Sequence, residues 1–137
     1  MTGDVDNSGR TPPEPIERNA RRVERRRRYR RGHVAEALAV AMLSLKGYRV
    51  LGRRVVTPSG EIDLIAVRGK RLAFVEVKRR ATREAAEASI SDQQRRRVRR
   101  AADLWLARRP AFHGHDLCFD LVLVLPWRWP VHLENSL

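Results

Sequence analysis

The segment "GEIDLIAVRGKRLAFVEVKRR", residues 60–80, specifies the central hairpin of the fold. It consists of two apolar runs separated by Gly69-Lys70, and a two-residue connection with Gly in first position is typical of a type II′ β-hairpin turn. The register of such a turn places Ile65 opposite Phe74, because the residues on both sides are counted outward from the turn. The segment therefore predicts a hairpin of two buried strands.

The same register places acids at the open end of this hairpin. Asp63 falls opposite Glu76 and Glu61 opposite Lys78, all on one face of the sheet. Directly opposed carboxylates destabilise a sheet unless they share a proton or a cation lies between them. Mg²⁺, or Mn²⁺ in its place, prefers one or two carboxylates completed by water, which predicts Asp63 and Glu76 as metal ligands. Lys78 would orient an attacking water or stabilise charge on a phosphoryl oxygen.

A purely structural alternative exists for these acids. In it, Glu61 pairs with Lys78, and Asp63 and Glu76 form salt bridges with the many arginines of the chain. This alternative accounts for charge balance, but it leaves unexplained why two acids meet on a half-apolar strand face.

The charge of the chain indicates a polyanionic partner. Its 137 residues carry a net charge of +13, with nucleic acid the first candidate and an anionic membrane the second. Eight arginines lie in residues 21–31 and five in residues 95–100. The alternative is a solvated basic face, but so many arginines with so few acids favour bidentate phosphate contacts. DNA is preferred to RNA as the partner.

The remaining pattern predicts one α/β domain. Residues 1–20, rich in Gly, Pro, Ser and acids, are expected to be a disordered leader, and residues 21–137 a single domain. The expected order is helix, three strands, helix and strand, with a last short strand at an edge. The segments are a helix at 32–47, a strand at 48–60, the hairpin, a weak helix at 81–92, a helix from Ser91 to Pro110, and strands at 116–126 and 129–137.

The first of these helices is apolar on two sides, which predicts that it packs between other elements. Its rows are Val34, Leu38, Ala41 and Leu45 on one side and Val40 and Leu43 on the other, the second headed by Glu36. In the helix that begins at Ser91, the narrow apolar stripe is Val98, Ala101, Ala102 and Trp105.

Several single residues have two interpretations. Glu36 is either a first-turn acid favoured by the helix dipole or a member of the site. Asp120 interrupts an apolar strand and fits a buried partner for an arginine better than a metal ligand. Trp127 and Trp129 either stack on unpaired bases or pack at an edge. Cys118 is the single cysteine, and with no membrane-spanning or signal segment it indicates a cytoplasmic protein.

These motifs together resemble a known family. "GEIDLIA" and "FVEVKRR", preceded by "GHVAEALA" and "GYRVL" and followed by "CFDLVLV", are similar to the small bacterial YraN-like family. That family is placed in the PD-(D/E)XK, or restriction-endonuclease-like, superfamily, close to archaeal Holliday-junction resolvases. The resemblance covers residues 31–137.

The resemblance implies an αβββαβ nuclease core with a mixed sheet flanked by helices. Asp63, Glu76 and Lys78 fall on the catalytic triplet of the superfamily, and Glu36 falls on the acid contributed by its first helix. Ile62 stands where the superfamily has proline. The chain has "DQQRRR" where the family usually has Lys-Gln, so Gln94 takes the place of that lysine, unless it serves a capping box with Ser91.

Three functions remain open at this point. The first is a Mg²⁺-dependent nuclease acting on DNA, which for symmetric cutting of a junction would be a homodimer. The second is a binding module that keeps the endonuclease fold without cutting, and the third an RNA- or membrane-binding basic protein that leaves the hairpin acids unexplained. The residues expected to contact nucleic acid are Arg53, Arg54, Arg79, Arg80, Gln94, Arg95 and Arg96.

Overall fold

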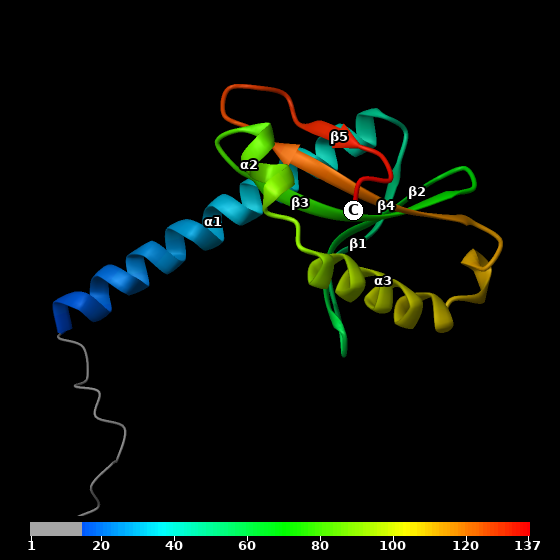
Figure 1. Ribbon diagram of the computed structural model, residues 1–137, viewed down its shortest axis with the longest axis horizontal. Helices are drawn as coiled ribbons and strands as arrows, with labels where there is room; N and C mark the ends of the chain where they lie inside the picture. Colours follow the sequence, from blue (N-terminus) through cyan, green and yellow to red (C-terminus); the bar gives the residue numbers. More distant parts are fainter. Residues whose placement is uncertain (1–14) are drawn as a thin grey trace, which may run out of the picture. The chain divides into compact units, whose positions relative to one another are not determined.

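The structure is a computed structural model that describes residues 15–137. Its elements are α1 (Pro15–Leu45), β1 (Arg49–Thr57), β2 (Gly60–Arg68), β3 (Arg71–Arg79), α2 (Arg83–Ala88), α3 (Asp92–Ala107), the 3₁₀ turn η1 (Pro110–Phe112), β4 (Asp116–Val124) and β5 (Val131–Leu133) (Figure 1). The predicted order of the main helices and strands is confirmed.

The strands form one open mixed sheet in the order β1-β2-β3-β4-β5. Every neighbouring pair is antiparallel except β3 and β4, which are parallel. A parallel pair needs a long crossover, and the segment containing α2 and α3 supplies it between these two strands. The expected class, a mixed sheet flanked by helices, is confirmed.

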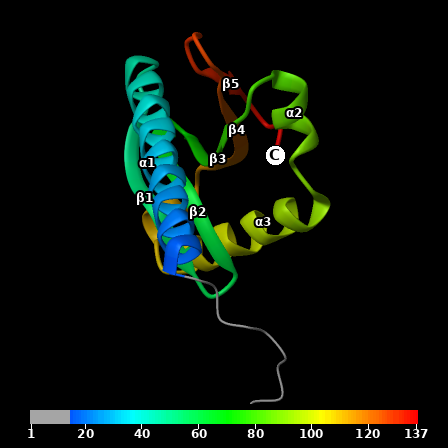
Figure 2. The same cartoon turned by 90° about the vertical axis from the view of Figure 1, so that its left-hand side faces the viewer.

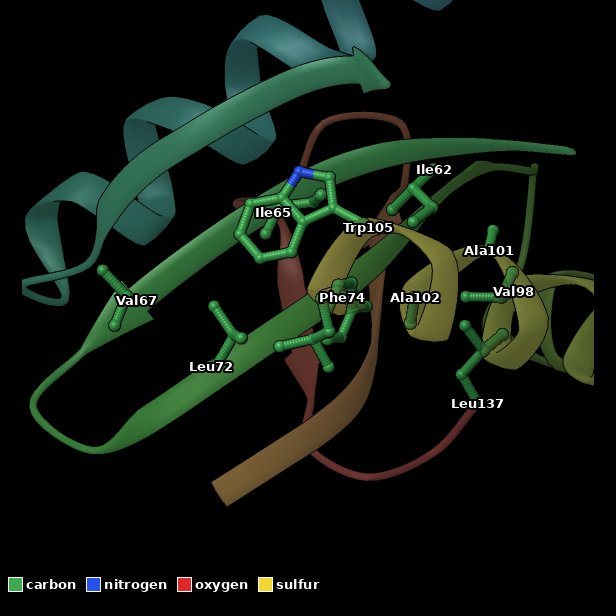
Figure 3. Packing of buried hydrophobic residues seen from close by; sticks show 11 residues of the cluster. Ile62, Ile65, Val67, Leu72, Phe74, Val98, Ala101, Ala102, Trp105 and Leu137 are labelled. Carbon is green, nitrogen blue, oxygen red and sulfur yellow. The ribbon is translucent and has the colours of Figure 1, made fainter. Parts of the chain in front are cut away.

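The helix α3 covers one face of the sheet. It begins at Ser91, whose hydroxyl accepts a hydrogen bond from the Gln94 backbone N–H at 3.1 Å, as an N-cap does. The predicted apolar stripe of α3 is buried against β2 and β3, where the indole of Trp105 meets the ring of Phe74 edge-on (Figure 3). The buried members labelled there are Ile62, Ile65, Val67, Leu72, Phe74, Val98, Ala101, Ala102, Trp105 and Leu137.

The other face is covered by the C-terminal part of α1, residues 32–45, which lies across the sheet from α3 (Figure 2). Here the predicted packing on two sides is wrong. The buried positions are Ala35, Glu36, Ala39, Met42 and Leu43, whereas the predicted row of Val34, Leu38, Ala41 and Leu45 is exposed. The sheet covers only one stripe of the helix, and small alanines at spacing i, i+4 let the backbones approach closely.

The N-terminal boundary also differs from the expectation. Residues 15–20, assigned by composition to the leader, are helical, and residues 1–14 lie outside the described part of the chain. The chain divides into two units at Arg31 and Gly32, so the sheet, α2, α3 and the C-terminal part of α1 belong to residues 32–137. The arginines of 21–31 lie in the first unit with exposed side chains. Within residues 15–137, no helix is long and apolar enough to cross a membrane.

A buried charged network ties β3, β4 and β5 together, and it confirms Asp120 as a partner of an arginine. Arg71 donates two hydrogen bonds to the fully buried Asp120 carboxylate, at 2.6 and 2.9 Å, and the Asn135 backbone N–H donates a third at 2.9 Å. Burial by itself would raise the pKa of Asp120, but the hydrogen bonds from His132, Arg71 and Asn135 outweigh it and hold that pKa at about 2.

The same network determines the tautomer of His132. Its Nδ1 lies 2.6 Å from the Lys46 ammonium, which can only donate, so Nδ1 accepts. The proton of the neutral ring is then on Nε2, which donates to Asp120 at 2.7 Å. Each polar group is therefore satisfied, as burial at this depth requires.

Candidate functional site

The candidate site lies where β2 parts from β3. The predicted hairpin register is confirmed for the pairs from Arg68–Arg71 to Leu64–Val75, and the ladder ends there. Beyond it, the Val77 backbone N–H donates to Asp63 Oδ2 at 2.8 Å. A carboxylate thus takes the place of a strand carbonyl, so the predicted direct pairing of Asp63 with Glu76 is replaced by a contact with the next residue of β3.

An irregular stretch of β1 accompanies this separation. Arg54 has a φ of +48°, and the β1–β2 pairing shifts register between Val50 and Gly52. Irregularities of this kind bend a strand pair and re-aim side chains, and they are frequent beside active sites. β2 stays paired with β1 as far as Gly60, so it follows β1 and leaves β3. The Asp63 side chain fills the opening.

Glu76 of β3 makes polar contacts with Gln94 and Lys78 in the candidate site. Its residue is only 7% exposed, and its Oε1 accepts a hydrogen bond from Gln94 Nε2 at 2.5 Å. Lys78, two positions along the strand and so on the same face, places its Nζ 3.4 Å from the same oxygen. Gln94 therefore uses its backbone to cap α3 and its side chain to bind Glu76, so it does not form the reciprocal capping box.

Glu36 reaches the site from α1. Since α1 begins at Pro15, Glu36 lies far from the first turn, and the helix-dipole interpretation is wrong. The residue is buried, and its Oε2 accepts a hydrogen bond from Arg54 Nε at 2.7 Å. Its charge also contributes to the pKa of Asp63, which places it within electrostatic range of that carboxyl.

Asp63 has an unusual protonation equilibrium. Burial raises its pKa, the charge of Glu76 raises it further, and the hydrogen bond from Val77 offsets only part of the effect. With smaller contributions from Glu36 and Glu61, the pKa of Asp63 reaches about 7. The site therefore holds more negative charge than it can stabilise alone, which a bound cation or a retained proton would relieve.

A cavity of about 570 Å³ opens beside Glu76 and Lys78. Its other lining residues are Ser59, Ser91, Gln93, Gln94, Arg97 and Arg100. The α3 members recur at the helical spacings i, i+4 and i+7 from Gln93, so one face of α3 forms the wall. The aliphatic stem of Arg97 lies over Gly60, where a Cβ atom would come within 2.7 Å of it. The glycine of "GEID" is required for this close approach.

Comparison with known proteins places this chain in a family. The model of "Uncharacterised protein family UPF0102" matches residues 35–124, a range that contains the carboxylates, Lys78 and Gln94. The chain belongs to the UPF0102 family. It is 56% identical to a UPF0102 protein of Mesorhizobium japonicum (83% of this chain, 91% of the relative) and 54% identical to one of Chelativorans sp. (83% and 92%). The family expected from the sequence motifs is thus confirmed.

None of the arginines predicted to contact nucleic acid lines the cavity of this UPF0102 chain. Arg54 pairs with Glu36, Arg95 with Asp92 at 3.3 Å, and Arg80 donates to the backbone oxygen of Arg79. The remaining predicted arginines, Arg53, Arg79 and Arg96, are exposed and do not line this cavity. Of the predicted contacts, only Gln94 lines it.

Arg97 and Arg100 are the basic residues that the sequence argument missed. The signal was present, because a helical period starting at Gln93 selects both positions. It could not be used without knowing which side of α3 faces the strand pair, since arginine occurs on several sides of this helix. The apolar stripe identifies the buried side of α3, but the flank of that side that borders Glu76 and Lys78 is defined only once the sheet is in place.

The donors of the site in this UPF0102 chain are compatible with a hard divalent cation. No group of three or more His, Cys, Asp or Glu suited to a metal occurs within residues 15–137. Mg²⁺ needs fewer protein ligands than that, since one or two carboxylates with several waters satisfy it. Asp63 and Glu76 would hold it. The raised pKa of Asp63 shows that its negative charge is unfavourable in this site, and a bound cation would stabilise that charge.

We expect Asp63→Asn to stabilise the metal-free protein at about pH 8 and to change little at about pH 4. The pKa of Asp63 rises from 3.8 to about 7 on folding, so the stability conferred by the retained proton is fully present below 3.8. It is lost as the pH rises through about 7, whereas asparagine has no proton to lose. Urea unfolding midpoints measured in EDTA across this range test the difference.

The exposed Asp103→Asn on α3 is the matched control, and it should show no such pH-dependent gain. Added Mg²⁺ should stabilise the parent protein at about pH 8 more than the Asp63→Asn variant. A gain of equal size at both pH values would contradict the assigned pKa.

Proposed function

We propose that this UPF0102 chain is a metal-dependent nuclease of the PD-(D/E)XK, restriction-endonuclease-like type that hydrolyses phosphodiester bonds in DNA. The convergence of Asp63, Glu76 and Lys78 at the opening between β2 and β3 carries this proposal. The order of strands and helices and the family resemblance support it, as does a buried Glu36 arriving from the first helix.

Each residue of the site has a role in this chemistry. Asp63 and Glu76 hold Mg²⁺ or Mn²⁺, which when bound lowers the pKa of water and polarises the phosphoryl group. Lys78 stabilises the negative charge that develops on the phosphoryl oxygens. Gln94 fixes the orientation of Glu76 through the 2.5 Å hydrogen bond, and Arg54 fixes that of Glu36. Arg97 and Arg100 bind phosphates of the substrate along the cavity.

The reaction is an ordinary hydrolysis. The oxygen of water forms a bond to phosphorus, and the bond between phosphorus and the leaving sugar oxygen breaks. One proton of the water passes to the leaving oxygen, and the other stays on the new phosphate monoester. Burial of Asp63 and the nearby charge of Glu76 raise the pKa of Asp63 toward neutrality, so cation binding and proton release at this carboxyl are linked.

A second function has one observation in its favour. Gln94 and Lys78 both contact Glu76 Oε1, so this carboxylate already has partners without a metal. A protein that keeps the endonuclease fold and binds DNA without cutting it would need no more than this closed network.

Cleavage of a labelled panel of DNA structures distinguishes the two. The panel contains duplex, single-stranded, flap and four-way-junction DNA, each incubated with Mg²⁺, Mn²⁺ or EDTA. A nuclease should give products only with metal, and the preferred substrate identifies the DNA structure that it reads. Tight binding with no product under any condition would exclude the nuclease and favour the binding module. Sedimentation with the preferred DNA tests whether two copies act together.

A further inference from the structure

A second hollow lies at the other side of the end of β3. Its volume is about 370 Å³, and it is formed where the loop after β4 meets α1. Figure 1 shows this loop, between β4 and β5, beyond the arrowhead of β4. The residues that matter for its chemistry are Val34, Leu38, Arg79, Trp127, Arg128 and Trp129. We call this set the tryptophan groove.

The aromatic rings of the tryptophan groove are held in solvent. Trp127 is 103% exposed and Trp129 is 58% exposed, which is rare for side chains with so much apolar surface. Trp127 also has a φ of +58°, a left-handed conformation that bulky residues seldom adopt. Strain of this kind persists where the surrounding structure imposes it, and it clusters at ligand-binding sites. The loop thus displays its indoles rather than burying them.

The charge of the groove selects the kind of partner. Its charged lining residues within the described chain are the two arginines, Arg79 and Arg128, and none is acidic. Aromatic faces flanked by guanidinium groups suit unpaired nucleotides, because each base stacks on a ring while its phosphate meets a cation. An apolar protein segment would not require the two arginines.

The location of the groove favours a single strand over a duplex. Lys78 lines the cavity beside Glu76, and the next residue, Arg79, lines the tryptophan groove, so the two open on opposite faces of one strand end. Duplex DNA is too stiff to bend around one β-strand, with a persistence length of about 50 nm. A single strand is flexible enough to contact both faces.

From these observations we infer that the tryptophan groove binds unpaired nucleotides of a DNA strand by stacking on Trp127 and Trp129. The strand continues around the end of β3 to the carboxylate site, so the substrate has single-stranded character beside the bond to be cut. This inference rests on the proposed DNA function and specifies its substrate class.

The test is equilibrium binding of the full chain to short oligothymidylate and to a hairpin duplex, both in EDTA so that no cleavage occurs. We expect Trp127→Ala and Trp129→Ala each to weaken oligothymidylate binding about tenfold or more, with duplex affinity changed by less than about twofold. Trp127→Phe should restore most of the affinity. Leu104→Ala, which removes an exposed apolar side chain of α3, is the matched control and should have no effect.

Tryptophan fluorescence supplies an independent readout. The third tryptophan, Trp105, is buried in the core, so quenching by oligothymidylate should disappear when Trp127 and Trp129 are both replaced. Equal losses for single-stranded and duplex DNA, or no loss for either, would overturn the inference. Unchanged DNA affinity with a loss of self-association in sedimentation would also overturn it and assign the groove to contacts between copies.

The outcome of the oligothymidylate binding test does not depend on whether the protein cleaves DNA. A chain that never cuts DNA passes the test if the groove binds single strands, and an active nuclease fails it if the groove does not. The outcome of the cleavage panel and the outcome of the binding test are therefore read separately.

Discussion

Replacing Glu76 with glutamine, or Asp63 with asparagine, is expected to abolish metal-dependent cleavage while leaving DNA binding in EDTA nearly unchanged. Each substitution removes one of the two carboxylates that would hold the cation, and an amide is a poor ligand for a hard divalent metal. The hydrogen bonds of the site can persist, because the amide side chain introduced by either substitution still carries an oxygen that accepts from Val77 N–H or from Gln94.

The expected loss in kcat is about a thousandfold or more, since metal activation is worth several kcal/mol and about 1.4 kcal/mol corresponds to each factor of ten. Glu61→Gln is the matched control. Glu61 lies on the same strand two positions from Asp63 and is exposed, so its replacement should change kcat by less than about threefold. Cleavage that survives in both site variants would remove these carboxylates from the mechanism and with them the proposed nuclease.

Replacing Asp120 with alanine is expected to lower the free energy of unfolding by about 3–5 kcal/mol, because it leaves Arg71 and His132 without their shared partner in the interior. Asp120 is completely buried and joins three strands through four hydrogen bonds. Urea unfolding at neutral pH measures the loss. Asp103→Ala on the exposed side of α3 is the control and should cost less than about 0.5 kcal/mol.

The pH dependence of this contribution has a definite sign. The pKa of Asp120 falls from 3.8 to about 2 on folding, so its stabilising effect is present above about pH 4 and is lost as the pH falls through about 2. The difference between the parent and the Asp120→Ala protein should shrink on acidification. A loss of under about 1 kcal/mol at neutral pH would show that the network contributes little net stability, as some buried ion pairs do.

Asp120 and Asp63 illustrate how the environment decides the role of the same type of side chain. Asp120 receives hydrogen bonds from Arg71, His132 and Asn135, so its pKa falls and it acts as a structural anion. Asp63 has one backbone donor and faces the charge of Glu76, so its pKa rises toward neutrality. A carboxylate such as Asp63, whose pKa is raised by burial and a neighbouring charge, is typical of functional sites. A carboxylate such as Asp120, with all its hydrogen bonds formed, is typical of a protein core.

Local patterns of residues were sufficient to predict several features of this protein. A two-residue turn and strict alternation specify the register of the β2–β3 hairpin near Gly69, because both act over a few residues. The serine cap and the apolar stripe likewise specify the start and the buried side of α3. The family motifs identify the same strands, and in the structure Gln94 Nε2 and Lys78 Nζ lie 2.5 and 3.4 Å from Glu76 Oε1.

Other features depend on packing between distant segments. Several apolar positions compete on α1, and the sheet buries the stripe with Ala35, Ala39, Met42 and Leu43 instead of the predicted row that starts at Val34, so the position of the sheet selects the buried side. Asp63 accepts a hydrogen bond from the Val77 backbone N–H instead of pairing directly with Glu76, because the β2–β3 ladder ends at Leu64 and Val75 while β2 stays paired with β1. Arg97 and Arg100 enter the site for a related reason. Their positions depend on where a helix crosses a sheet, and this is a property of long-range packing that no local pattern of residues encodes.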